Sequence, residues 1–223
     1  MFRTLLLISV LASNSLVLSG CSQKFQDVNS TIAEYWKSGD DIELSSEEIA
    51  ALPYSSAYFK FGEQGQIFMV LAFAETNLRT GLQQLKWMSS DRVMVVTENG
   101  RIVQTLQLPN ENLVSLQYDY PEFKKIDKNI TQEWDSTYDW QPDYRFGYSA
   151  KTTRNHIGSE MVVTPLTTIQ TDKFSETTYF TALDQSIQNE FWVDESGRVV
   201  KSVQFLGPEM TKVELTILKD FKG

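Results

Sequence analysis

The residue with the most specific chemistry is Cys21, the only cysteine of the chain, which directly follows Leu18, Ser19 and Gly20. The small residues Ser19 and Gly20 give a protease access to the backbone, and the thiol that follows them can carry diacylglycerol. We therefore interpret Leu18-Ser19-Gly20-Cys21 as a lipobox, in which cleavage makes Cys21 the lipid-bearing N-terminus. The alternative is an ordinary secretion signal followed by an unrelated cysteine.

The residues before Cys21 have the layout of a secretion signal. Arg3 supplies a positive charge and an apolar run follows from Leu5 to Val10, but Ser13, Asn14 and Ser15 interrupt the apolar stretch. That stretch is shorter than the roughly 20 residues that cross a bilayer. We expect residues 1–20 to be removed as a signal peptide, with residues 21–40 forming a lipid anchor and an N-terminal helix and residues 41–223 forming one β-rich domain.

The lipid predicts where the protein resides. Because each buried methylene adds about 0.8 kcal/mol to membrane binding, the three acyl chains of an acylated Cys21 make anchoring in a lipid bilayer essentially permanent. Position 22 is Ser, whereas an Asp there favours retention in the inner membrane. We expect attachment to the outer membrane, on its periplasmic face.

Residues suited to catalysis or metal binding do not converge in the sequence. The chain has one histidine, His156, in a segment typical of a turn or loop, and no Gly-x-Ser-x-Gly elbow. A zinc site with one histidine and no free thiol is disfavoured as well. We predict no catalytic residues, no metal and no cofactor.

Aromatic and acidic side chains alternate in one segment near the middle of the chain. Aromatic rings can stack on the apolar faces of sugars while carboxylates bond to the hydroxyls, so this segment offers candidate glycan contacts: Trp134, Tyr138, Asp139, Trp140 and Tyr144. The alternative is that the rings fill gaps over a β core and the acids remain in solvent. Cleavage of a glycan would need two carboxylates about 5–9.5 Å apart, a separation that a sequence does not give.

Hydrophobic periodicity predicts a mainly β protein. Apolar residues at helical spacing predict helices at 25–39 and 45–52, the second capped by Ser45 or Ser46. Alternation then indicates strands at 57–61, 66–73, 82–88, 92–97, 101–108, 145–151, 160–170, 177–183, 188–193, 199–205 and 211–218. We expect a single antiparallel β-sandwich or open barrel-like meander with one or two N-terminal helices, and a long loop or lid over residues 110–143.

Length and charge restrict the partners. Removal of the signal peptide shortens the 223 residues to 203, enough for one domain with a substantial core. Arg3 is the only charged residue removed with it, so the net charge changes from −9 to −10. That balance disfavours nucleic acid and anionic lipid surfaces as partners.

Several short motifs follow one another in order from near Asp41 to the last predicted strand: Ala51-Leu52-Pro53-Tyr54, Ile67-Phe68-Met69-Val70-Leu71, Trp87, Val93-Met94-Val95-Val96-Thr97, Asn99-Gly100-Arg101, Phe191-Trp192-Val193-Asp194, Gly197, Val199, Ser202 and Gln204. Their order and spacing together resemble the YjbF/GfcB family of lipoproteins encoded with capsule and exopolysaccharide genes. Residues 110–145 match the family pattern poorly.

The resemblance implies a β-rich lipoprotein, associated with the outer membrane, that assists production or export of group 4 capsule or a related exopolysaccharide. It brings no catalytic residues. Three interpretations therefore stand: a non-enzymatic accessory protein that binds export proteins and the polysaccharide, a carrier of lipid or lipid-linked glycan in a β cavity, and a glycan-modifying enzyme that uses two carboxylates. An apolar pocket on the order of 300 Å3 or more would favour the carrier.

Overall fold

The computed structural model describes residues 41–119, 122–123 and 127–222, so the lipobox and the helix expected at residues 25–39 lie outside it. Within these ranges the chain forms one short helix and twelve strands. In chain order they are α3 (Ser46–Ala51), β1 (Ser56–Phe61), β2 (Ile67–Thr76), β3 (Gln83–Met88), β4 (Met94–Glu98), β5 (Arg101–Leu106), β6 (Asn112–Tyr118), β7 (Gln132–Gln141), β8 (Arg145–Val163), β9 (Thr168–Phe180), β10 (Gln185–Val193), β11 (Val199–Phe205) and β12 (Lys212–Lys219).

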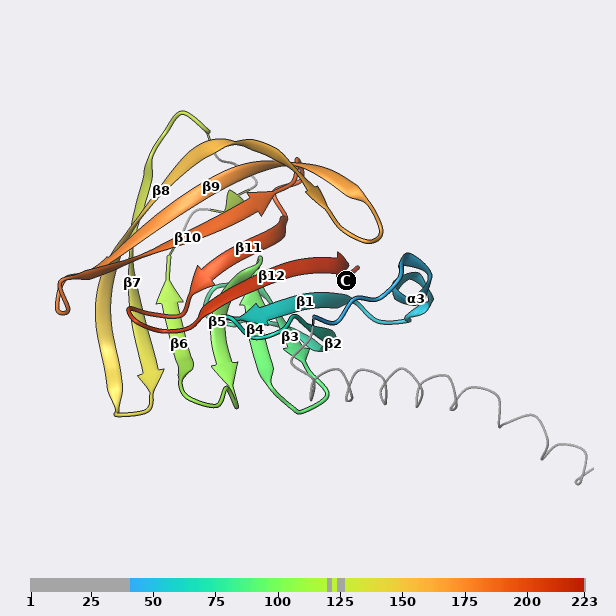
Figure 1. The fold of residues 1–223 in the computed structure, drawn as a ribbon. Coiled ribbons are helices and arrows are strands. Elements are labelled where there is room, and N and C mark those ends of the chain that lie inside the picture. Colours follow the sequence, from blue (N-terminus) through green and yellow to red (C-terminus); the bar gives the residue numbers. More distant parts are fainter. Residues whose placement is uncertain (1–40, 120–121, 124–126, 223) are drawn as a thin grey trace, which may run out of the picture.

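The strands form a single antiparallel sheet that curls until its two ends meet. Its order is β5-β4-β3-β2-β1-β12-β11-β10-β9-β8-β7-β6, so β5 and β6 stand at the two ends although they are consecutive in the chain. Figure 1 shows these two strands next to each other, and the Leu113 N–H of β6 donates to Thr105 Oγ1 of β5 at 2.9 Å. The expected mainly β, barrel-like meander is confirmed.

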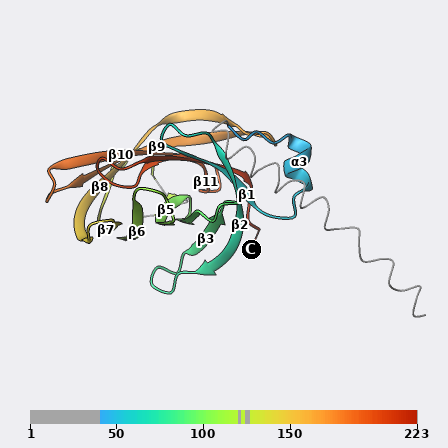
Figure 2. The ribbon, with the colours of Figure 1, turned by 60° about the horizontal axis from the view of Figure 1, so that its bottom comes forward.

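The curled sheet is flattened into two layers with the core between them. Seen from below, β8 to β11 lie in one layer and β3 to β6 in the other (Figure 2). Side chains from both layers meet in one apolar cluster that includes Phe59, Trp87, Trp140, Phe180 and Leu215. This packing follows from the two-residue period of strands, which points alternate side chains inward.

Helix α3 lies beside β1 and β12, in the middle of the strand order (Figure 1). Ser45 caps its N-terminus in a capping box with Glu48, which confirms the helix predicted at 45–52. Ile49 is fully buried and packs with Tyr58 of β1 and Leu218 of β12 in a separate small cluster.

The long loop or lid expected over residues 110–143 is wrong. Half of this segment forms β6 and β7, which pair with each other, and β7 also pairs with β8. Trp134, Ser136, Tyr138 and Trp140 alternate inward along β7, while the residues between them are less buried. The irregular composition came from acids and polar residues on the outer face of an ordinary strand.

The second half also has longer strands than expected. A separate strand was predicted at 160–170, but β8 continues from Arg145 to Val163, and residues 164–167 form the turn to β9. His156, expected in a turn or loop, lies within β8 just before an irregularity in the β8–β9 register at Gly158. Gly158 has a φ of +148°, so the glycine permits this bulge.

Candidate functional site

The aromatic residues singled out as glycan contacts divide into two groups. Trp134, Tyr138 and Trp140 are buried in the barrel interior, and Trp140 has no exposed surface. The rings of Tyr138 and Trp140 lie 5.0 and 5.5 Å from the ring of Phe180, measured between centroids, and Trp140 Nε1 donates to the carbonyl of Leu206 at 2.7 Å. These three side chains occupy core positions, which agrees with the alternative that the rings fill gaps over a β core.

The other two candidates lie at the end of the β7–β8 hairpin. Tyr144 is 91% exposed, and Asp139 accepts a hydrogen bond from the Gly147 N–H at 2.7 Å. The structure therefore does not gather the five candidates on one surface. Glycan contact by this segment stays a prediction, and the only exposed ring it can use among the four is that of Tyr144.

The barrel interior instead holds a buried cluster of three charged side chains from three strands. Glu176 of β9 is fully buried, and both of its carboxylate oxygens lie 2.6 Å from Arg101 Nη2 of β5. Arg154 Nε of β8 donates to Glu176 Oε1 at 2.8 Å. Both guanidinium groups also lie over aromatic rings, Arg154 at 4.0 Å from the Phe123 centroid and Arg101 at 4.8 Å from the Phe191 centroid.

The electrostatics of this cluster keep its carboxylate ionised. Burial alone would raise the pKa of Glu176, but the charges and hydrogen bonds of Arg101 and Arg154 outweigh it and hold that pKa below the ordinary value of 4.5. Burial also raises the pKa of the nearby Tyr138 hydroxyl. A carboxylate that is held ionised by two arginines is poorly suited to donate a proton.

A second buried carboxylate is that of Glu98, at the end of β4. Its Oε1 accepts hydrogen bonds from Asn77 Nδ2 at 2.6 Å and from Gln84 Nε2 at 2.7 Å, and its Oε2 accepts one from the Tyr118 hydroxyl at 2.7 Å. Three neutral donors therefore satisfy this carboxylate. It connects the β2–β3 hairpin, β4 and β6 at one side of the barrel.

His156 does not lie in a nucleophilic site. Its Nε2 is 3.3 Å from Asp172 Oδ1, and the Ser159 hydroxyl donates to the same Oδ1 at 2.7 Å. Nucleophilic catalysis needs the histidine between the serine and the acid, but here the acid lies between the other two. Among the described residues, no three His, Cys, Asp or Glu side chains come together as a metal site.

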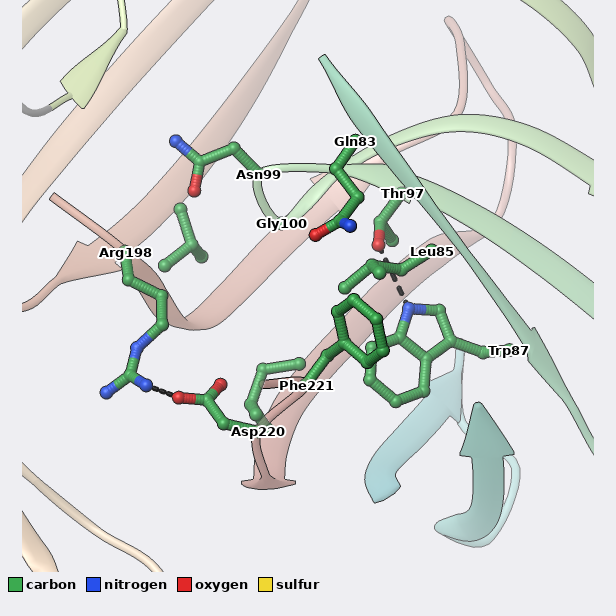
Figure 3. A pocket seen from close by; sticks show the side chains of 11 residues that line it. Gln83, Leu85, Trp87, Thr97, Asn99, Gly100, Arg198, Asp220 and Phe221 are labelled. Carbon is green, nitrogen blue, oxygen red and sulfur yellow. Dashed lines mark hydrogen bonds and ion pairs between the residues drawn. The ribbon is translucent and has the colours of Figure 1, made fainter. Parts of the chain in front are cut away.

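A partly open cavity of about 260 Å3 is lined by residues of β3, β4 and the β4–β5 turn and, opposite them, of β11, β12 and the C-terminal end of the chain (Figure 3). Its wall combines aromatic, amide and charged groups from four separate parts of the chain: Gln83 and Trp87 of β3, Asn99, Arg198, and the C-terminal residues Asp220 and Phe221. Trp87 Nε1 donates to Thr97 Oγ1 at 2.9 Å, which fixes the indole. Arg198 forms ion pairs with Asp194 and Asp220.

Neither the charged cluster nor the cavity was predicted from the sequence. Arg101 and Glu176 are 75 positions apart, and Gln83 and Phe221 are further apart still, so no local spacing links them. One signal was present: in β8, Arg154 occurs two residues after the inward-facing Thr152, at a position where a strand points into the core. A charged residue at such a position indicates a buried partner.

The fold and these sites define the protein as a nearly closed, antiparallel β barrel with a filled interior and a side cavity next to Trp87. No helix in the described part of the chain is long and apolar enough to span a membrane.

Comparison with known proteins gives the family. The sequence profile of a family described as "Group 4 capsule polysaccharide lipoprotein gfcB, YjbF" matches residues 25–218. The uncharacterized lipoprotein GfcB of Escherichia coli K12 is 31% identical over 94% of this chain and 97% of its own length. The uncharacterized lipoprotein YjbF of the same strain is 27% identical over 93% and 95%, respectively.

A solved structure agrees with this assignment. The crystal structure of the hypothetical lipoprotein YmcC from Escherichia coli K12 superposes with a TM-score of 0.71 at 31% identity, covering 81% of this chain and 91% of that one. The chain therefore belongs to the YjbF/GfcB family of group 4 capsule polysaccharide lipoproteins. The resemblance found in the sequence is confirmed, and the protein is a capsule-associated lipoprotein.

Proposed function

We propose that this protein is a lipid-anchored accessory factor on the periplasmic face of the outer membrane, where it assists assembly or export of a capsule or exopolysaccharide without catalysing a reaction. The observation that carries the proposal is the match of the capsule lipoprotein family to residues 25–218, directly after the lipobox cysteine. Its partners are export proteins and the polysaccharide itself.

The anchor supports the proposed location. Cys21 follows Leu18, Ser19 and Gly20, and the residue after it is Ser22 rather than the Asp that favours the inner membrane. Nineteen residues lie between Cys21 and Asp41, where the described chain begins.

The chemistry of the interior supports a role without catalysis. The two most buried carboxylates already have structural partners: Glu176 binds two arginines, and Glu98 accepts from three neutral donors. A glycosidase of the common two-carboxylate type needs one acid that can give up a proton beside a second acid at a free cleft. The enzyme alternative therefore has the least support.

The size of the cavity bears on the carrier alternative. Pockets that enclose a drug-sized ligand have volumes of roughly 300–1,000 Å3. The cavity beside Trp87, at about 260 Å3, is below that range, and charged and amide groups contribute to its wall. It fits a small ligand better than the long chain of a lipid-linked glycan.

A deletion strain tests the proposed function. We expect it to lose much of its surface polysaccharide, measured by immunoblotting of whole cells and of the culture medium, and the wild-type gene to restore it. A deletion strain with a normal amount of surface polysaccharide would overturn the proposal.

Two variants test the anchor separately. Ser22→Asp keeps the lipid but should shift the protein from the outer-membrane to the inner-membrane fraction of a sucrose gradient. A second variant, secreted with a non-lipoprotein signal and carrying Cys21→Ala, should be found in the soluble periplasmic fraction. If the Cys21→Ala variant remains in the outer-membrane fraction, the lipid is not the anchor that we propose. If Ser22→Asp remains there, residue 22 does not decide between the two membranes.

A further inference from the structure

Two aromatic rings contribute to the wall of the cavity beside Trp87. Trp87 is almost completely buried, its indole nitrogen is bonded to Thr97, and its ring lies 6.3 Å from that of Phe59 between centroids, so it forms a fixed base for the wall. Phe221 contributes a second ring from the C-terminal end of the chain, and Figure 3 shows both rings along one side of the cavity. Phe221 is only half-buried, so its ring supplies the apolar face that a ligand can reach.

Amide groups at the edge of the cavity supply hydrogen-bonding capacity. The Gln83 side chain lines it and forms no side-chain hydrogen bond with the part of the chain that is described, and its amide offers both donors and an acceptor. Asn99, at the β4–β5 turn, makes only a long contact of 3.4 Å from its Nδ2 to the Gly197 carbonyl. Aromatic faces next to amides match the two sides of a sugar ring, one apolar and one rich in hydroxyl groups.

The charges around the cavity favour a neutral ligand. Arg198 is its only lining cation, and this guanidinium is already shared by Asp194 and Asp220. Two carboxylates therefore surround one arginine, which leaves a local net negative charge. A ligand with a carboxylate or phosphate would be repelled there.

The shape of the cavity limits the ligand to one ring. At Gly100, an added Cβ atom would lie 2.4 Å from the Cβ of Val199, so the β4–β5 turn and the start of β11 touch and close one end. A volume of about 260 Å3 is small for a larger ligand. We infer that the cavity lined by Trp87, Phe221, Gln83 and Asn99 binds a single neutral sugar residue of a glycan.

This inference rests on the proposed function only for the choice of a glycan as the source of that sugar. The site itself is tested with purified protein. The full mature chain with Cys21→Ser is titrated with glucose, galactose and N-acetylglucosamine, followed by tryptophan fluorescence and calorimetry. Glucuronate serves as an acidic sugar of similar size, and palmitate as an apolar ligand. We expect saturable binding of at least one neutral sugar and at least about tenfold weaker binding of glucuronate.

Variants locate the binding. Phe221→Ala should weaken the affinity by about tenfold and Gln83→Ala by about three- to tenfold, because each removes one contact. Both residues lie near the surface, so the fold should be kept, which circular dichroism checks. Tyr179→Ala, which removes a partly exposed ring of β9 that does not line the cavity, is the matched control and should leave the affinity unchanged.

Three results would overturn the inference. These are the absence of saturable binding with every neutral sugar, binding that persists unchanged in both Phe221→Ala and Gln83→Ala, and saturable binding of palmitate alone. None of them bears on the capsule phenotype of the deletion strain, so a failure of this site and a failure of the proposed function are told apart.

Discussion

At the scale of single residues, the feature that most constrains the barrel is the buried carboxylate of Glu176. Two guanidinium groups surround it, and these come from strands β5 and β8. A buried ion pair of this kind often adds little net stability compared with apolar residues, but removal of one partner leaves an uncompensated charge in the interior. Replacement of Glu176 should therefore lower the free energy of unfolding by much more than the ion pairs add to it relative to apolar residues.

Glu176→Gln should lower the free energy of unfolding by about 3–5 kcal/mol, because two buried arginines lose their counter-charge. The matched control is Glu190→Gln on β10, whose carboxylate pairs with Lys173 at 3.0 Å near the surface and should cost no more than about 1 kcal/mol. Chemical denaturation followed by tryptophan fluorescence measures both. Equal losses in the two variants would contradict a special role of the buried cluster.

The same carboxylate predicts a pH dependence. Burial raises the pKa of Glu176, but the two arginines lower it further, so the folded-state pKa is below the ordinary value of 4.5. The stabilisation is then fully present above pH 4.5 and is lost as the pH falls through the folded-state pKa. We expect the denaturation midpoint to fall on acidification below pH 4.5, and to fall less in Glu176→Gln. The pKa values of Asp172 and Asp194 are also lowered, so part of the fall in the midpoint with falling pH should remain in the variant.

At the scale of elements, short strands joined by tight turns were the easiest features to predict. Val199–Phe205 has the predicted bounds, and the Asn99-Gly100 turn joins β4 to β5, which were predicted at 92–97 and 101–108. Asn99 and Gly100 have φ angles of +44° and +73°, which suits the two-residue turn that this dipeptide favours. Local residue chemistry is sufficient for such features because turn geometry is itself local.

Elements whose outer faces are polar were missed. In β7 the inward alternation of Trp134, Tyr138 and Trp140 was present in the sequence, but the acids between them suggested a loop. The long β8–β9 hairpin continues through polar residues because each strand is paired along its length with the other. The cavity could not be predicted at all, since only the curl of the sheet brings Gln83, Arg198 and Phe221 together.

The β4–β5 turn gives a prediction at this scale. Gly100→Ala should destabilise the protein by more than Gly81→Ala, although both glycines have a φ of +73°. An alanine at Gly81 meets nothing within 4 Å and suffers only backbone strain, of about 1–2 kcal/mol. At Gly100 the new methyl group also collides with Val199, which adds about 1–3 kcal/mol. Thermal unfolding of the two variants measures the difference, and the same melting temperature for both would contradict the close approach.

At the scale of the whole molecule, side-chain hydrogen bonds hold the barrel together where backbone pairing between strands is missing. No ladder joins β5 to β6 in the described sheet, so the barrel would have two free edges there. Side chains link the strand at one of these edges to the opposite layer: Gln204 of β11 accepts from the Ile102 N–H at 3.0 Å and donates to the Gly100 carbonyl at 2.8 Å, and Arg101 reaches Glu176. These links hold β5 against the second layer and so shape the cavity beside it.

The junction between β5 and β6 is the seam of the barrel. There the buried Thr105 hydroxyl accepts a hydrogen bond from the Leu113 N–H. Thr105→Val keeps the shape but removes the acceptor, so a buried backbone donor is left without its partner at a cost of about 1–3 kcal/mol. We expect a loss of that size in chemical denaturation, and faster hydrogen exchange at the Leu113 amide than at amides in the middle of the sheet. Thr168→Val, at an exposed position of β9, is the control and should change the stability by less than about 0.5 kcal/mol. If Thr105→Val leaves exchange at Leu113 unchanged, the seam is held by packing and not by this hydrogen bond.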